Sequence, residues 1–261
     1  MSKILEASGF SIFKNYLSKK DSEYLFNTFV NFCKFYCPNL FLNSYKKKWL
    51  DINFNNQLIK LRKDNPKIFV AIYNSFARSS AMYQFCYESK LHELAADILE
   101  ENKKNLGLRD PILRIDVPGD KRNIYGWHQD SAYSNLHINS KNEIIFWLPL
   151  VNTTKKNGTI IVKPKSHEIN KNVSYLKNKG GKYKSKQFLI KEKFLQKFKS
   201  SHIDVKANSV LASYGNLFHK SGFNFSKKIR FTIIVRFYKI LVKDYIHYRE
   251  NIKDINKYSR Y

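Results

Sequence analysis

Cysteine, acidic residues and long apolar runs are all scarce in this chain. Only three cysteines occur among 261 residues, which argues against a disulfide framework and favours a reducing cytoplasm. The longest apolar run, IIFWLPLV at 144–151, is too short to cross a bilayer. The N-terminal MSKILEASGF also lacks the apolar core of a signal peptide. We therefore expect a cytoplasmic protein without a membrane span.

The shortage of acidic residues leaves a strong positive charge. There are 21 acidic and 47 basic residues, so the formal net charge is +26 at pH 7. Lysine supplies 38 of the 47 basic residues, as genome-level codon bias alone would also produce. Residues 171–200 hold ten lysines and one glutamate. A patch of this density attracts nucleic acid, acidic lipid or a phosphorylated substrate, whereas a solvated loop is the plainer interpretation.

The first 105 residues follow helical spacing, and the sequence after them changes in texture. Ser18 with Asp21 three residues later predicts a capped helix start, and Pro38 ends the apolar pattern that follows. A second apolar stripe runs through 89–101, with His92 off the stripe and expected at the surface. After Gly107, short apolar runs alternate with turn residues, which predicts the strands of a sandwich or barrel.

No Pro- or Gly-rich linker separates the helical part from the β part, so we expect one domain over 1–261. Residues 1–105 would be mostly helical support, 106–240 the β core and 241–261 a C-terminal helical segment. The lysine-rich stretch 168–200 interrupts the strand pattern and is interpreted as an insertion or lid. The predicted class is α+β with a mainly β core and helices packed outside it.

A possible metal site lies in NIYGWHQDSAYSN, residues 123–135. His128 and Asp130 are two residues apart, and on a strand alternate side chains point to the same face. This imidazole and carboxylate can therefore bind one metal ion. A facial iron triad needs a second imidazole from a distant strand, and His219 is the best candidate.

Other histidines were weaker candidates for that site. His202 and Asp204 repeat the His-x-Asp spacing, but they follow a lysine-rich stretch, so we expect them at the surface where a strand begins. His167 ends a strand and is expected to make a structural hydrogen bond. His137 and His247 have no supporting context in the sequence.

The segment IRFTIIVRFY separates an arginine-bearing face from an apolar face. Arg230, Thr232, Ile234 and Arg236 alternate with large apolar residues. The apolar face is expected to pack against helices, so the other face would look into a barrel. A buried guanidinium there needs an anionic partner. An acidic small molecule could supply it through a bidentate contact, and a protein carboxylate is the structural alternative.

Taken together, these segments resemble the phytanoyl-CoA dioxygenase family of Fe(II)/2-oxoglutarate oxygenases, from about Ile112 to Tyr238. WHQD is similar to the metal-binding strand of the family, WLPLVNTTKKNGTIIVKPKSH to the next strand pair, and HKSGFNFSKKIRFTIIVRF to the distal segment. The resemblance implies a double-stranded β-helix of the jelly-roll or cupin-like type. One departure is Lys165, where the family usually has Gly, so this turn is expected to differ in shape.

The resemblance also implies roles for named residues. His128, Asp130 and His219 would bind iron, while Ser221 and Arg230 would hold the distal carboxylate of 2-oxoglutarate. Gln129 and Trp147 match family positions near the cosubstrate or the substrate.

The implied activity is hydroxylation of an unactivated C–H bond, with consumption of O2 and conversion of 2-oxoglutarate to succinate and CO2. The intact Asp130 supports hydroxylation, because related halogenases replace this carboxylate by a small residue. We expect a small-molecule substrate, and the lysine-rich segment favours one that bears a phosphate or carboxylate. Two alternatives stay open. The first is a nucleic-acid or nucleotide demethylase, favoured by the basic charge and the spacing of Arg230 and Arg236. The second is a non-catalytic basic binding protein on the same fold, which the complete ligand set disfavours.

Overall fold

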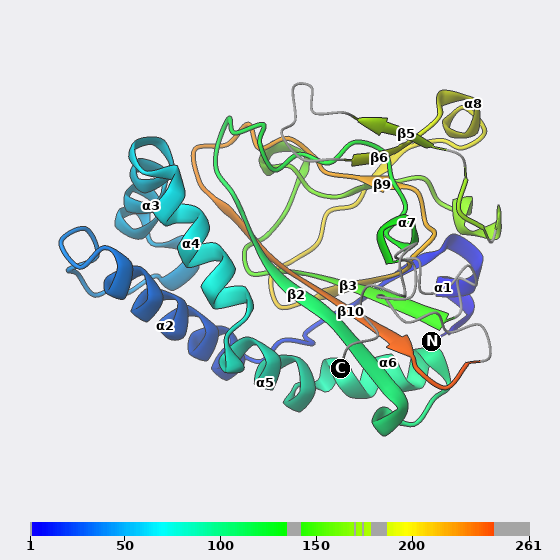
Figure 1. Cartoon of the computed structure of the whole chain (residues 1–261), viewed down its shortest axis with the longest axis horizontal. Helices are drawn as coiled ribbons and strands as arrows, with labels where there is room; N and C mark the ends of the chain where they lie inside the picture. Colours follow the sequence, from blue (N-terminus) through cyan, green and yellow to red (C-terminus); the bar gives the residue numbers. More distant parts are fainter. Residues whose placement is uncertain (1, 135–141, 170, 174, 179–186, 243–261) are drawn as a thin grey trace, which may run out of the picture.

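The computed structural model describes residues 2–134, 142–169, 171–173, 175–178 and 187–242 (Figure 1). Its helices are α1 (Ser2–Ser8), α2 (Lys19–Tyr36), α3 (Ile52–Asp64), α4 (Pro66–Ala77), α5 (Ser80–Glu88), α6 (Lys90–Leu99), α7 (Ser131–Ser134) and α8 (Glu192–Leu195). Short 3-10 helices are η1 (Lys48–Leu50), η2 (Lys103–Asn105), η4 (Lys155–Asn157) and η5 (Ser166–Ile169). The strands are β1 (Phe10–Phe13), β2 (Leu106–Asp116), β3 (Glu143–Pro149), β4 (Ile161–Val162), β5 (Tyr175–Asn178), β6 (Gln187–Ile190), β7 (Ser201–His202), β8 (Val210–Tyr214), β9 (His219–Lys220) and β10 (Arg230–Lys239).

The N-terminal helices form where the sequence predicts them. The Ser18 hydroxyl accepts the backbone N–H of Asp21 at 3.0 Å and so caps the start of α2. This helix ends at Tyr36, just before Pro38, and buries Phe29 completely. His92 on α6 is half-buried rather than at the surface, because its ring stacks on Phe237 with a centroid distance of 5.3 Å.

Two antiparallel sheets form the β core. The larger sheet has the strand order β1-β8-β3-β10-β2, and the smaller one has the order β7-β4-β9. The edge strand β1 lies inside the segment predicted to be mostly helical. Its four residues are too short a run to signal a strand, and only pairing with β8 reveals it. The α+β class with an antiparallel β core is confirmed.

The larger sheet separates two apolar layers. One face of β10, which includes Phe231 and Phe237, packs with the N-terminal helices in a single hydrophobic cluster. Figure 1 shows helices α2 to α6 gathered along this side of the sheet. The other face of the larger sheet carries Ile234 of β10 and Trp147 of β3, which pack with Val162 of the smaller sheet. The predicted alternation along β10 is therefore confirmed, and Arg230 and Arg236 of this strand lie on the interior face between the sheets.

Parts of two predictions lie outside the described residues. The lysine-rich stretch contains an antiparallel pairing of β5 with β6 and the short helix α8, whereas residues 170, 174 and 179–186 are outside the described chain. The proposed lid stays a prediction. The C-terminal helical segment also stays one, because residues 243–261 are not described. Within the described ranges, no helix combines the length and the apolar character needed to cross a membrane.

The turn at Lys165 keeps the backbone shape that a glycine would favour. Lys165 has a φ of 66°, in the left-handed region, and its N–H donates to Ser8 O at 2.9 Å. The lysine therefore adopts a conformation that is strained for a residue with a Cβ, and the expected difference of this turn from the family stays a prediction.

Candidate active site

The two candidate histidine ligands lie opposite each other on paired backbone segments. His128 N–H donates to His219 O at 3.0 Å, and His219 N–H donates to His128 O at 3.1 Å. This is an isolated bridge and not the regular strand predicted for WHQD, since α7 begins at Ser131 directly after Asp130. The short extended stretch still brings His128 and Asp130 to one side, where His219 joins them.

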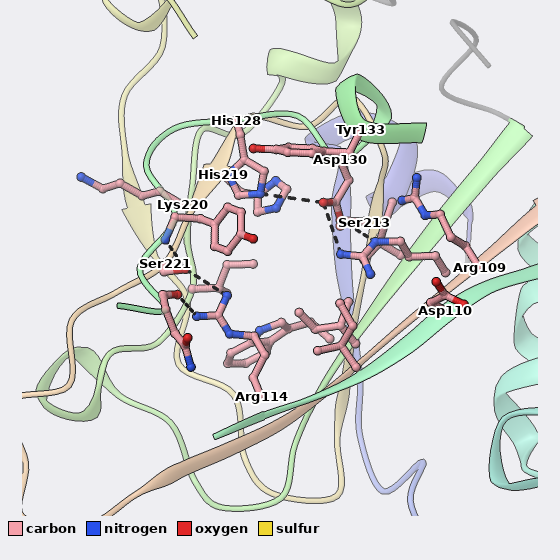
Figure 2. Close-up of a pocket in the computed structure, with 18 of the residues that line it drawn as sticks. Arg109, Asp110, Arg114, His128, Asp130, Tyr133, Ser213, His219, Lys220 and Ser221 are labelled. Carbon is pink, nitrogen blue, oxygen red and sulfur yellow. Dashed lines mark hydrogen bonds and ion pairs between the residues drawn. The ribbon is translucent and has the colours of Figure 1, made fainter. Parts of the chain in front are cut away.

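Backbone carbonyl groups orient both imidazoles. His128 Nδ1 is 2.8 Å from Gly126 O, and His219 Nδ1 is 2.9 Å from Leu217 O. A carbonyl can only accept, so each Nδ1 carries the proton and each Nε2 keeps a free lone pair. The ligand atoms of His128, Asp130 and His219 all lie within 4.8 Å of one another. Figure 2 shows the three side chains converging on one point, so this donor set fits a facial-triad metal.

The surroundings hold His128 and Asp130 in their metal-binding forms. Burial, together with the neighbouring His219, lowers the pKa of His128 to about 3, although Asp130 opposes this shift. Burial raises the pKa of Asp130, but Arg236 and the two histidines outweigh it and hold this pKa well below its ordinary value. At neutral pH the site therefore presents a neutral imidazole beside a carboxylate.

Arg236 binds the carboxylate of the candidate ligand. Its Nε and Nη2 donate to Asp130 Oδ2 and Oδ1 at 3.2 and 3.4 Å. The strand-paired neighbour of Arg236 on β2 is Arg109, whose Nη2 lies 2.8 Å from Glu143 Oε1. The four charged groups lie on the interior side of the larger sheet, where the two carboxylates are buried and the two guanidiniums are partly exposed. A carboxylate can bind a metal and a guanidinium together, so Arg236 orients Asp130 without excluding a metal.

A cavity of about 650 Å³ opens beside the three candidate ligands. Its wall combines aromatic and aliphatic side chains with a set of arginines. The cationic members are Arg109, Arg114, Arg122, Lys220, Arg230 and Arg236. Figure 2 shows Lys220 extending away from the centre, where it lies 4.8 Å from the Trp127 ring.

Arg230 is in the cavity wall, as the sequence predicts, and it has a protein partner. Its Nη2 donates to Asp116 Oδ2 at 2.6 Å, so the alternative of pairing with a carboxylate is also realised. Its Nε and Nη1 are buried without a hydrogen-bond partner in the described part of the chain. Two unused donors on a side chain that is only 2% exposed fit an absent anion such as a carboxylate.

Ser221 is hydrogen-bonded to Arg114, and its predicted role in holding 2-oxoglutarate stays a prediction. Arg114 Nη1 donates to Ser221 Oγ at 3.2 Å, and Arg114 Nη2 donates to Asp116 Oδ1 at 2.8 Å. Asp116 thereby joins the two arginines. Burial raises the pKa of Asp116, but Arg114 and Arg230 outweigh it and keep this pKa below its ordinary value. The sequence interpretation missed Arg114 and Asp116, although their alternation in PILRIDV places both on one strand face.

The remaining predicted residues divide between the cavity and the scaffold. Trp147 lines the cavity, and its ring lies 5.8 Å from the Arg230 guanidinium carbon. Gln129 does not line it. Its Nε2 donates to Lys171 O and Asn216 O at 3.0 and 2.9 Å, and its Oε1 accepts Val173 N–H at 3.0 Å. These bonds give Gln129 a structural role, and its expected position near the cosubstrate or the substrate stays a prediction.

Two rival histidines, His167 and His202, lie where the sequence predicts them. His202 and Asp204 are exposed around β7, apart from the candidate ligands. His167 Nε2 lies 2.8 Å from Glu6 O, which is the expected structural hydrogen bond. His137 and His247 fall outside the described residues.

Comparisons with known proteins identify the family and the fold. The family model described as phytanoyl-CoA dioxygenase (PhyH) matches residues 56–232, which begins within α3, well before the predicted start of the resemblance. No significant match was found among curated proteins.

Several solved structures share the fold at low sequence identity. The apo form of the non-heme monooxygenase ThoJ has a TM-score of 0.59 and 16% identity, over 91% of this chain and 76% of that one. EctD from S. alaskensis with bound Fe has a TM-score of 0.58 and 13% identity, over 91% and 75%. The non-heme alpha ketoglutarate dependent epimerase SnoN has a TM-score of 0.57 and 12% identity, over 91% and 81%.

Proposed function

Because this chain belongs to the phytanoyl-CoA dioxygenase family, we propose that it is an Fe(II)- and 2-oxoglutarate-dependent oxygenase that hydroxylates a small metabolite. The main support is the triad of His128, Asp130 and His219, whose ligand atoms lie within 4.8 Å beside a cavity. When bound, Fe(II) and 2-oxoglutarate supply oxygen activation, so that R–H, O2 and 2-oxoglutarate become R–OH, succinate and CO2.

Different residues of this chain would bind the metal and the cosubstrate. His128 and His219 present Nε2 to the metal, and Asp130 presents a carboxylate that Arg236 holds in place. Arg230 has two unused buried donors for the distal carboxylate of 2-oxoglutarate. Ser221, which we predicted beside it, supports this subsite through Arg114. Burial of these groups keeps water away from the reacting centre.

The intact carboxylate at Asp130 supports hydroxylation over halogenation. The solved structures with the same fold include a monooxygenase and an epimerase, so the finer reaction rests on the residues. The spacing of Arg230 and Arg236, which also suits a nucleic-acid demethylase, has another explanation here. Arg230 pairs with Asp116 and Arg236 pairs with Asp130. We therefore favour a small-molecule substrate.

The test needs no knowledge of the substrate. Fe(II) and then 2-oxoglutarate are added to anaerobic protein, and a visible metal-to-ligand charge-transfer band is recorded. We expect the band in the native protein and in His202→Ala, a control that removes an exposed histidine from the rival His-x-Asp pair. His219→Ala and Asp130→Ala should abolish it. Absence of the band in folded, iron-supplied native protein would refute the proposed function.

A further inference from the structure

A β-bulge re-aims one arginine of β2 into the cavity. Opposite β10, Ile234 pairs with Ile112 and Arg236 pairs with Arg109, so two steps along β10 match three along β2. The extra residue falls at Asp110–Pro111. Proline has no N–H for the ladder and is typical of bulges, and bulges next to active sites commonly redirect a side chain. Without this register shift Asp110, and not Arg109, would share the interior face with Arg236.

Arg109 has one hydrogen-bonding arm that the described residues do not use. Its Nη2 pairs with Glu143 at 2.8 Å, whereas its Nη1 is buried without a hydrogen-bond partner in the described ranges. The side chain is 20% exposed and lines the cavity. A buried N–H of a charged group without an acceptor is costly, so its presence in a cavity wall indicates a ligand acceptor there.

Arg109 lies apart from the predicted cosubstrate subsite. Figure 2 shows it beyond Asp130, on the side opposite Ser221 and Arg114. Since the proposed cosubstrate subsite contains Arg230 and Ser221, Arg109 lines the part of the cavity that is left for the substrate. Asp110 is nearby, but it is exposed to solvent and accepts from Tyr83 Oη at 3.3 Å.

The buried charges around the cavity do not balance. The guanidiniums of Arg109, Arg114, Arg230 and Arg236 face only the carboxylates of Asp116, Asp130 and Glu143. Fe(II) and the dianion of 2-oxoglutarate cancel each other, so the loaded site keeps one excess positive charge. An uncompensated buried charge is unfavourable, so a monoanion completes the site.

We infer that Arg109 is a specificity-determining residue whose Nη1 binds a carboxylate of the substrate, so that the enzyme selects a monocarboxylic acid over its neutral analogue. This inference rests on the proposed function, because it takes the Arg230 subsite to be filled by 2-oxoglutarate. One free guanidinium nitrogen suits one carboxylate oxygen, whereas a phosphate dianion would overcompensate the single excess charge.

The test titrates matched acid and amide probes into the anaerobic complex of protein, Fe(II) and saturating 2-oxoglutarate. The probes are benzoate with benzamide and hexanoate with hexanamide, and phenyl phosphate serves as the dianionic probe. Perturbation of the charge-transfer band reports binding near the metal. We expect at least one carboxylate to bind native protein about 10- to 100-fold more tightly than its amide, as a charge-assisted hydrogen bond predicts.

Variants assign that preference to Arg109. Arg109→Gln should remove the preference for the acid and leave the band intact. Arg122→Gln, which removes a 44% exposed guanidinium from the same cavity wall, should retain it. If Arg109→Gln unfolds because Glu143 loses its partner, the double variant Arg109→Gln/Glu143→Gln removes both charges and tests the same point.

The outcomes separate the two proposals. A missing band in the native protein would refute the oxygenase proposal. A normal band would instead overturn the inference if no carboxylate bound, if acid and amide bound equally, or if Arg109→Gln kept the preference. Tighter binding of phenyl phosphate than of both carboxylates would also overturn it.

Discussion

Arg236 donates hydrogen bonds to both carboxylate oxygens of Asp130, from Nε to Oδ2 at 3.2 Å and from Nη2 to Oδ1 at 3.4 Å. This contact joins the middle of β10 to a residue that the chain places 106 positions earlier. It fixes the orientation of Asp130, a candidate metal ligand, independently of a metal ion. Ligand orientation by a neighbouring residue is a common determinant of metal affinity, so the contact leads to a specific expectation.

Arg236→Gln should weaken Fe(II) binding by about 10- to 100-fold, because Asp130 loses its orienting partner. Arg236→Lys keeps the charge but not the bidentate geometry. Its affinity for Fe(II) should therefore lie between that of the native protein and that of Arg236→Gln. Anaerobic titration of Fe(II), with thermal melting of the apo-proteins as a folding control, measures the effect. An unchanged affinity in well-folded Arg236→Gln would contradict this role.

Arg230→Gln should chiefly weaken the binding of 2-oxoglutarate. Loss of a charged, buried donor costs about 1.5–3 kcal/mol, which corresponds to a roughly 10- to 150-fold higher Kd. Asp116 keeps Arg114 as its partner, so the fold should persist. Titration of 2-oxoglutarate into the Fe(II)-loaded protein gives the Kd, and Arg78→Gln, which removes an exposed arginine at the end of α4, is the control. Equal Kd values for native protein and Arg230→Gln would exclude Arg230 from the subsite.

Asp120 should make the folded state sensitive to acid. Its carboxylate is buried, which raises its pKa, but bonds from Arg122 and Arg62 outweigh this and lower the pKa to about 2. The ionised form is thus favoured by folding, and its stabilising effect is present above the ordinary pKa of 3.8 and is lost as the pH falls towards 2.

The free energy of unfolding of native protein and Asp120→Asn, measured by urea denaturation, should therefore differ most above pH 4 and converge near pH 2. Asp64→Asn is the control, because its pair with Lys60 is exposed and contributes little. A constant difference between native protein and Asp120→Asn across this range would show that ionisation of Asp120 does not stabilise the folded state.

Lys165→Gly should stabilise the protein. The φ of 66° is costly for a residue with a Cβ, and glycine adopts it freely. The gain is partly offset by the greater freedom of glycine in the unfolded chain, so we expect about 0.5–1 kcal/mol in urea denaturation. The backbone bond from Lys165 N to Ser8 O is retained by glycine. A loss of stability would mean that the lysine side chain contributes more than the strain costs.

Local pattern was sufficient for the parts of this protein that depend on neighbours in the chain. The cap at Ser18, the alternation along β10 and the pairing of His128 with Asp130 across one residue all follow from periods of 3.6 or 2. Alternation also predicted Arg230 on the interior face, whereas His219 was selected by weighing the other histidines and by the resemblance to the family.

Contacts between distant segments were decided only by the tertiary structure. Arg114 is hydrogen-bonded to Ser221, and Asp116 bridges Arg114 and Arg230 because β2 lies beside β10. A short strand such as β1 carries too little pattern to be recognised before its pairing is known.

The bulge at Asp110–Pro111 shows most clearly what the sequence pattern could not predict. A strict two-residue alternation predicts the wrong side chain for the interior, and the register against β10 turns Arg109 inward instead. The sequence by itself determined which residues can bind a metal, since side-chain chemistry and short-range geometry are local properties. Which arginine meets which carboxylate was decided by strand register, because register depends on the pairing of segments more than a hundred residues apart.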